Sequence, residues 1–143
     1  MNIFGLPLHP LVVHAAVVLM PLASLGALVV VVSSRARERF GWLTVAFAIA
    51  AAGAAVTARI SGEALAQSLG GIAPLIATHR LYGELTPWPA VALAITLPAG
   101  LLIRSRSKPA WVAAAALTVL AALAGLVLVV LTGDAGARAV WGT

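Results

Sequence analysis

Four long runs without a formal charge constrain the fold of this 143-residue chain more than any other feature. Each run is close to or longer than the ~20 apolar residues with which a helix crosses ~30 Å of hydrocarbon. Strands of a membrane barrel would alternate apolar and polar residues over ~10 positions, and these runs do not. The sequence therefore predicts an all-α, four-helix transmembrane bundle, a single integral membrane domain over residues 1–143 with spans at about 10–33, 40–59, 85–104 and 109–132.

The composition agrees with a membrane domain and excludes several kinds of chemistry. Hydrophobic residues make up 62% of the chain, charged residues 9%, and the mean hydropathy is +1.09. A soluble domain carries about 25% charged residues. The chain has no cysteine, which excludes disulfides, iron–sulfur clusters and thiolate chemistry. No basic stretch is interleaved with aromatic residues, so nucleic acid is not expected as a partner.

The charged residues between the runs predict the orientation of the bundle. Six basic residues and one acidic residue, a net charge of +5, separate the first run from the second and the third from the fourth: Arg35, Arg37, Glu38, Arg39, Arg104, Arg106 and Lys108. Such an excess of Lys and Arg marks cytoplasmic loops. The N-terminus and the C-terminus are therefore both expected on the outer side. The lipid bilayer is the first partner that this pattern implies.

The outer side is predicted to collect the remaining ionisable groups. These are His9, His14, Arg59, Glu63, His79, Arg80, Glu84, Asp134 and Arg138. Residues four apart lie on one helical face, so three ion pairs are expected: Arg59 with Glu63, Arg80 with Glu84, and Asp134 with Arg138. Ionisable groups at membrane depth are candidates for a functional site, because burying them is costly.

Three ligand chemistries fit this set of residues. A bis-histidine haem b would use His14 with His79, or His9 with His79. A divalent transition metal such as zinc or copper would use ligands from a larger set: His9, His14, His79, Glu63 and Asp134. A proton relay would pass protons between these groups and a quinone or water.

Other interpretations of the same residues remain open. The charges would serve only as salt bridges if the protein is an accessory or structural subunit. A small transporter would need an oligomer, because four helices leave little room for alternating access. The sequence shows no Ser/His/Asp order, phosphate loop or paired hydrolase carboxylates, and it therefore favours a protein that is not an enzyme.

Two structural questions also stay open. Residues 64–84 form either an interfacial or re-entrant segment over the site, or the start of one long third helix from about Pro74 with a kink near Pro87. The two helical hairpins suggest an internal repeat, because both turn through a loop with alternating basic residues. The string Arg-x-x-Gly-Glu occurs at 59–63 and 80–84, but it closes the second helix in one case and precedes the third in the other.

Several motifs resemble a known family. They are the opening Gly5-Leu6-Pro7-Leu8-His9-Pro10-Leu11-Val12-Val13-His14, then Ser61-Gly62-Glu63, His79 with Gly83-Glu84, and Trp141. Over essentially its whole length the chain resembles the bacterial four-helix transmembrane family catalogued as domain of unknown function 2231. The resemblance implies a bacterial inner (cytoplasmic) membrane location and the position of the site, with no established activity.

The resemblance also implies partners and one departure. Some relatives are joined to Rieske or cytochrome c domains, which implies redox proteins of the membrane or periplasm as partners; a homo-oligomer is a further candidate. Such proteins commonly carry Gly-His-x-Gly near the last helix, where this chain has Gly133-Asp134-Ala135-Gly136. The leading hypothesis is a small redox-associated protein that holds haem or a metal at the outer site.

Overall fold

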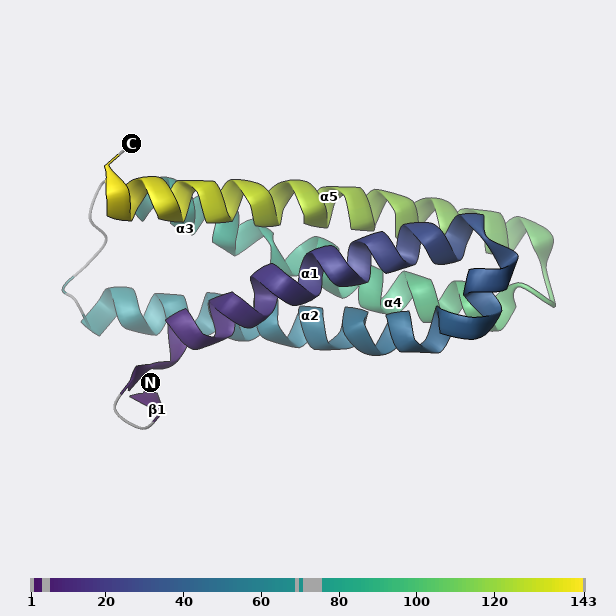
Figure 1. The fold of residues 1–143 in the computed structure, drawn as a ribbon, viewed down its shortest axis with the longest axis horizontal. Helices are drawn as coiled ribbons and strands as arrows, with labels where there is room; N and C mark the ends of the chain where they lie inside the picture. Colours follow the sequence, from purple (N-terminus) through teal and green to yellow (C-terminus); the bar gives the residue numbers. More distant parts are fainter. Residues whose placement is uncertain (1, 4–5, 69, 71–75, 143) are drawn as a thin grey trace.

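The computed structural model describes residues 2–3, 6–68, 70 and 76–142, and it is a bundle of long helices. The helices are α1 (Leu8–Val32), α2 (Ser34–Ser68), α3 (Ala77–Leu85), α4 (Pro87–Ile103) and α5 (Lys108–Trp141). The start of α1, the start of α3 and the end of α5 lie at one end of the bundle, here called the histidine end (Figure 1). The turns from α1 to α2 and from α4 to α5 lie at the opposite end, here called the turn end.

The predicted fold class is confirmed. Four helical segments are long and apolar enough to cross a membrane: Leu8–Val32, Ser34–Ser68, Ala77–Ile103 and Lys108–Trp141. The described residues add a short antiparallel ribbon before α1, in which β1 (Asn2–Ile3) pairs with β2 (Leu6–Pro7). The orientation of the two ends across the membrane stays a prediction.

The helices at the histidine end are longer than the predicted spans. At 1.5 Å per residue, the 35 residues of α2 cover about 50 Å, well beyond ~30 Å of hydrocarbon. Helix α3 runs almost directly into α4, and the backbone N–H of Thr86 donates to the Tyr82 carbonyl at 3.0 Å. The break falls before Pro87, which has no N–H to continue the ladder. In the described part of this segment, residues 64–68 end α2, Gly70 lies in a turn, and residues 77–84 belong to α3. These residues favour the long third helix with a break before Pro87, whereas Leu69 and residues 71–75, where that helix was predicted to begin, lie outside the described residues.

The turn end is tighter than the sequence predicts. Residues 35–39 are not a loop but the first turns of α2, and Ser33 alone separates α1 from α2. The side chain of Arg37 donates to the carbonyls of Val30 and Val31 at 2.9 and 2.6 Å. These bonds satisfy carbonyls that the end of a helix would otherwise leave without partners. The Arg37 guanidinium also lies 4.5 Å from the centre of the Trp111 ring.

Small residues form the contacts between the helices. Ala23, Ala27, Ala48 and Ala122 are completely buried, while large apolar side chains such as Val18 and Leu120 face outwards. In a membrane, close approach of helix backbones takes the place of the hydrophobic effect as the main source of helix association. The bundle is therefore held by close backbone contact inside and presents an apolar surface to lipid.

The buried positions repeat along the chain at two fixed spacings. Helix α1 and the third span share a spacing of 70 residues, as in the buried pairs Ala16/Thr86, Met20/Ala90, Ala23/Leu93, Ala27/Leu97 and Val30/Gly100. Helices α2 and α5 share a spacing of 74 residues, as in the buried pairs Thr44/Thr118, Ala48/Ala122, Ala51/Gly125, Ala55/Val129 and Ser61/Ala135. The two hairpins therefore bury matching faces.

These spacings define an internal two-fold relation. Helix α1 packs against α2 and α5, and α4 packs against the same two helices, so a half-turn about the bundle axis exchanges the hairpins. The string Leu-Thr-Val at 43–45 and 117–119 follows this relation, with a spacing of 74. The two Arg-x-x-Gly-Glu strings do not, because one lies on α2 and the other on α3. The two hairpins are thus related by an approximate internal two-fold axis.

Candidate functional site

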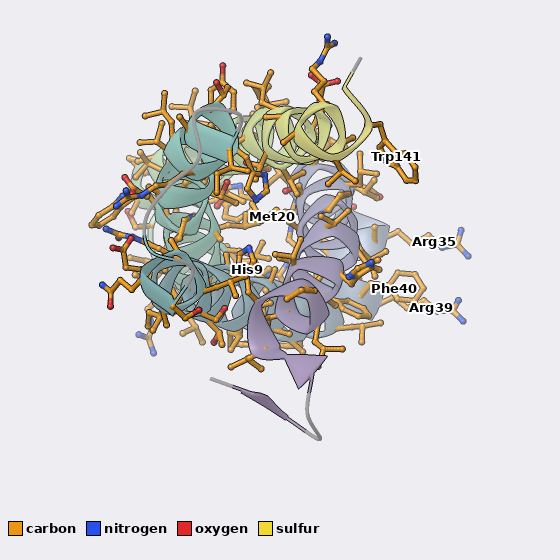
Figure 2. The ribbon with its side chains drawn as sticks, turned by 90° about the vertical axis from the view of Figure 1, so that its left-hand side faces the viewer. His9, Met20, Arg35, Arg39, Phe40 and Trp141 are labelled. Atoms are coloured by element: carbon orange, nitrogen blue, oxygen red, sulfur yellow. The ribbon has the colours of Figure 1, made fainter. Side chains whose placement is uncertain are left out.

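His9 lies inside the bundle, in the first turn of α1. Its side chain points into the space between the helices when the bundle is viewed from the histidine end, whereas Arg35 and Arg39 project outwards (Figure 2). Its Nδ1 atom lies 2.9 Å from the Ala58 carbonyl of α2. The Ser61 hydroxyl lies 3.4 Å from the same nitrogen and donates to the same carbonyl at 3.2 Å. The ring therefore ties α1 to α2.

His79 has the same role in the second hairpin. Its Nδ1 atom lies 2.8 Å from the Thr132 carbonyl of α5. The Thr86 and Thr132 hydroxyls lie 3.2 Å apart, so that one can donate to the other, and each also has the carbonyl four residues before it within reach, Tyr82 at 2.8 Å and Leu128 at 2.6 Å. The His79 ring ties α3 to α5. The rings of His9 and His79 are neighbours across the bundle axis, with centroids 6.3 Å apart and planes at 80°.

The hydrogen bonds determine which nitrogen of each ring carries a proton. A carbonyl oxygen can only accept, so Nδ1 is the donor in both rings. In the neutral imidazole, Nε2 is then an unprotonated acceptor. Histidines that bind metals are oriented in this way, by donating the other ring N–H to a backbone carbonyl or carboxylate. Both Nε2 atoms are therefore available to a ligand.

A cavity of about 970 Å³ surrounds the two imidazoles at the histidine end. Its lining includes both rings and small or apolar residues from all four spans, among them Ala16, Ala55, Gly83 and Val129. Arg59, Glu63, Arg80 and Glu84 also line it. Sites for small molecules and cofactors have this size, ~300–1,000 Å³, and combine an apolar lining with a few polar groups.

The ion pairs differ in part from those predicted. Arg80 bridges Glu63 and Glu84, with nitrogen–oxygen distances of 2.9 and 2.7 Å. Arg138 binds Asp134 at 2.8 Å, as the spacing predicts. The predicted pair of Arg59 with Glu63 is wrong for the described residues, because Arg80 reaches Glu63 from the neighbouring helix. Arg59 lines the cavity and forms no ion pair with any residue that the structure describes.

Two predicted ligands lie outside this cavity. His14 is exposed, and its Nδ1 atom lies 2.6 Å from the Pro10 carbonyl of its own helix. Five residues correspond to about 1.4 helical turns, so His14 points some 140° away from His9. Asp134 is exposed on the outer face of α5, beside Arg138. The structure therefore does not bring His14 and His79 together, whereas it does bring together His9 and His79, the other pair that the sequence predicts.

The larger metal site is not assembled either. Within the described part of the chain, no group of three or more His, Cys or carboxylate side chains is placed to hold a metal ion. Of the five predicted metal ligands, His9 and His79 come together. Glu63 lines the same cavity but is bound to Arg80. The arrangement offers two imidazoles rather than the three or four protein ligands of a zinc site.

Two glycines complete the site. Gly62 of α2 lies against the His9 ring, and Gly136 of α5 lies against the His79 ring. One feature of the sequence could have indicated them. His9 and His79 are 70 residues apart, the spacing that relates α1 to the third span, and Gly62 and Gly136 are 74 residues apart, the spacing that relates α2 to α5.

The fold and this site define a four-span membrane protein with a paired-imidazole cavity at one end. The chain belongs to the family described as predicted membrane protein (DUF2231), whose sequence model matches residues 5–143. This match confirms the family that the motifs indicate. Comparisons with curated proteins and with solved structures gave no match.

Proposed function

We propose that this membrane protein binds haem b in the cavity at its histidine end, with the Nε2 atoms of His9 and His79 as the two axial ligands. The observation that carries the proposal is that both rings are fixed through Nδ1 on backbone carbonyls and line one cavity, with centroids 6.3 Å apart. Bundle proteins build cofactor sites in this way, from side chains on facing helices.

The number of imidazoles favours haem over a bare metal ion. A bis-histidine haem takes four of its iron ligands from the macrocycle and needs two from the protein. A zinc or copper ion would need further protein ligands, and the described residues do not gather them. The cavity volume of about 970 Å³ also exceeds what a single ion requires.

The residues of this chain would each contribute to such a site. The Ala58 and Thr132 carbonyls hold the two rings in one tautomer, and the apolar lining limits the access of water. Arg59 lines the cavity and would serve as a counter-ion for a carboxylate of the ligand, whereas Arg80 is already bound to Glu63 and Glu84. A bound haem would supply one-electron transfer.

The proposal extends to the location of the site and its partners. The positive charge of the turn end supports a cytoplasmic position for that end and an outer position for the cavity. In a bacterial cytoplasmic membrane, the cavity would then face redox proteins of the membrane or periplasm.

The rival function is that of an accessory membrane subunit. It is favoured by one observation, namely that each histidine ties two helices together and needs no ligand to do so. In that case, replacing the histidines would change stability and nothing else.

Absorption spectroscopy separates the two functions. The full chain is purified in mild detergent, haem is added in increments, and spectra are recorded oxidised and dithionite-reduced. The proposal predicts saturation at one haem per chain and sharp reduced α and β bands. It also predicts their loss in the double variant H9A/H79A and their retention in H14A. A featureless or unsaturable spectrum of the unmodified protein would exclude haem and favour the accessory subunit.

A further inference from the structure

We infer that the cavity is a two-fold symmetric site in which His9 and His79 are equivalent, and that Gly62 and Gly136 are its equivalent positioning residues. The identity of the ligand in this inference rests on the proposed function, whereas the roles of the two glycines do not. Neither glycine is a ligand. Each acts on the histidine that faces it.

Each glycine is needed because a side chain there would collide with an imidazole. A Cβ atom on Gly62 would lie 2.9 Å from Cε1 and 3.1 Å from Nδ1 of His9. A Cβ atom on Gly136 would lie 2.9 Å from Nδ1 and 3.2 Å from Cε1 of His79. Both glycines lie within helices and have no positive φ, so their backbone conformation is open to any residue. The site therefore requires the absence of a side chain at Gly62 and Gly136, not an unusual backbone conformation.

The same geometry occurs in both hairpins. His9 donates to the carbonyl of Ala58, four residues before Gly62, and His79 donates to the carbonyl of Thr132, four residues before Gly136. In an α-helix the carbonyl of residue i points toward residue i+4. A side chain at i+4 would cover that carbonyl, whereas glycine leaves it open to a ring from the adjacent helix. The glycine and the carbonyl together form an imidazole-binding notch, and each hairpin supplies one such notch.

The symmetry bears on the kind of ligand that the site accepts. A ligand on the axis would meet an unprotonated Nε2 atom from each side, because both rings have the same tautomer and lie at matching positions of the two hairpins. This suits a metal centre with two identical axial positions, such as the iron of a planar macrocycle. It does not suit an ion that needs three or four ligands of mixed kind.

Four alanine variants test the roles of the glycines in the haem-loaded protein. G62A and G136A are compared with G53A and G133A, where a new Cβ atom would meet nothing within 4 Å. Loss of a group that orients a metal-binding histidine typically costs ~10–100-fold in affinity. We expect G62A and G136A each to weaken haem binding at least tenfold and to shift the reduced α band, with G53A and G133A unchanged. An effect in one of the two variants alone would overturn the equivalence.

Nitrogen NMR of the histidine side chains tests the same inference without a ligand. In the ligand-free protein, His9 and His79 should both show the tautomer protonated at Nδ1. G62A should perturb the His9 signals and leave those of His79, and G136A should do the reverse. If both glycine variants leave the histidine signals unchanged, the glycines do not position the rings. If the NMR pattern holds but no haem binds, the positioning stands and the haem proposal fails.

Discussion

The two hairpins bury matching faces, yet they differ in what surrounds their histidines. His9 has the Ser61 hydroxyl beside it, with Ala16 and Ala58 at the positions where the His79 half has Thr86 and Thr132. The positions of Arg80 and Glu84, which carry an ion-pair network beside His79, correspond to Pro10 and His14 in the first hairpin.

This comparison distinguishes the features of the site that both halves share from the features that differ between them. The histidine, the carbonyl four residues before a glycine, and the glycine itself are present in both halves. The hydroxyls and charges around them are not matched. The first group defines a notch for an imidazole in each half, and the second makes the two sides of the cavity chemically different.

The difference with the largest expected effect on stability lies where the hairpins pack on each other, at Met20 of α1 and Gly125 of α5. A Cβ atom on Gly125 would lie 1.8 Å from the Met20 methyl group, so the methionine fills the space that the glycine leaves. The positions equivalent to Met20 and Gly125 are Ala90 of α4 and Ala51 of α2, so both are alanine there. M20A should lower the free energy of unfolding by ~2–5 kcal/mol, because it leaves a cavity in the core. Denaturant titration in mixed detergent micelles measures this change.

A double variant tests whether the two halves are interchangeable here. M20A/G125A places alanine at both positions, as at the equivalent positions Ala90 and Ala51, and it should recover part of the stability that M20A loses. Equal stability of M20A and M20A/G125A would mean that the halves are not equivalent in the core.

The next difference is the hydroxyl pair of Thr86 and Thr132. These hydroxyls are 3.2 Å apart between the third span and α5. T132V should cost about 1 kcal/mol of stability, the usual net contribution of a buried hydrogen bond. Thermal unfolding followed by circular dichroism measures it. T57V is the matched control, because the Thr57 hydroxyl donates at 2.8 Å to Gly53 within its own helix. A loss in T57V as large as in T132V would contradict this account.

The smallest expected effect concerns the charges. Arg80 joins Glu63 of α2 to Glu84 of α3, whereas Arg138 binds Asp134 on the same helix. Exposed ion pairs contribute ~0.2–1 kcal/mol each and weaken in salt. R80A should therefore lower the thermal midpoint slightly more than R138A, and added salt should reduce the gap. Identical midpoints at low salt would show that the bridge between α2 and α3 contributes nothing.

The sequence predicted the architecture well because its signal is a property of whole segments. Charge-free runs of about twenty residues predict spans whatever the detailed contacts are. The same sorting of charges indicated which end of the bundle would hold His9 and His79 together with Arg59, Arg80 and Arg138. The third helix could not be settled, because Gly70, Gly71 and Pro74 interrupt the pattern before it.

Individual site residues were harder to predict, because their roles depend on which face of a helix each side chain occupies and on which helix supplies its partner. His14 has a suitable depth but the wrong face of α1. Glu63 has two arginines within reach, and spacing along one helix cannot reveal that Arg80 approaches from another. Gly62 and Gly136 have no side-chain chemistry, so their residue type does not mark them as part of a site. The paired spacings of 70 and 74 residues were the available signal.

Electron paramagnetic resonance of the oxidised, haem-loaded protein tests the central claim most directly, because it reports how many imidazoles bind the iron. The account predicts a low-spin signal in the unmodified chain and in H14A. It predicts a high-spin signal, or loss of haem, in H9A and in H79A alike. A low-spin signal that survives in either of these two variants, or that disappears in H14A, would contradict the paired site.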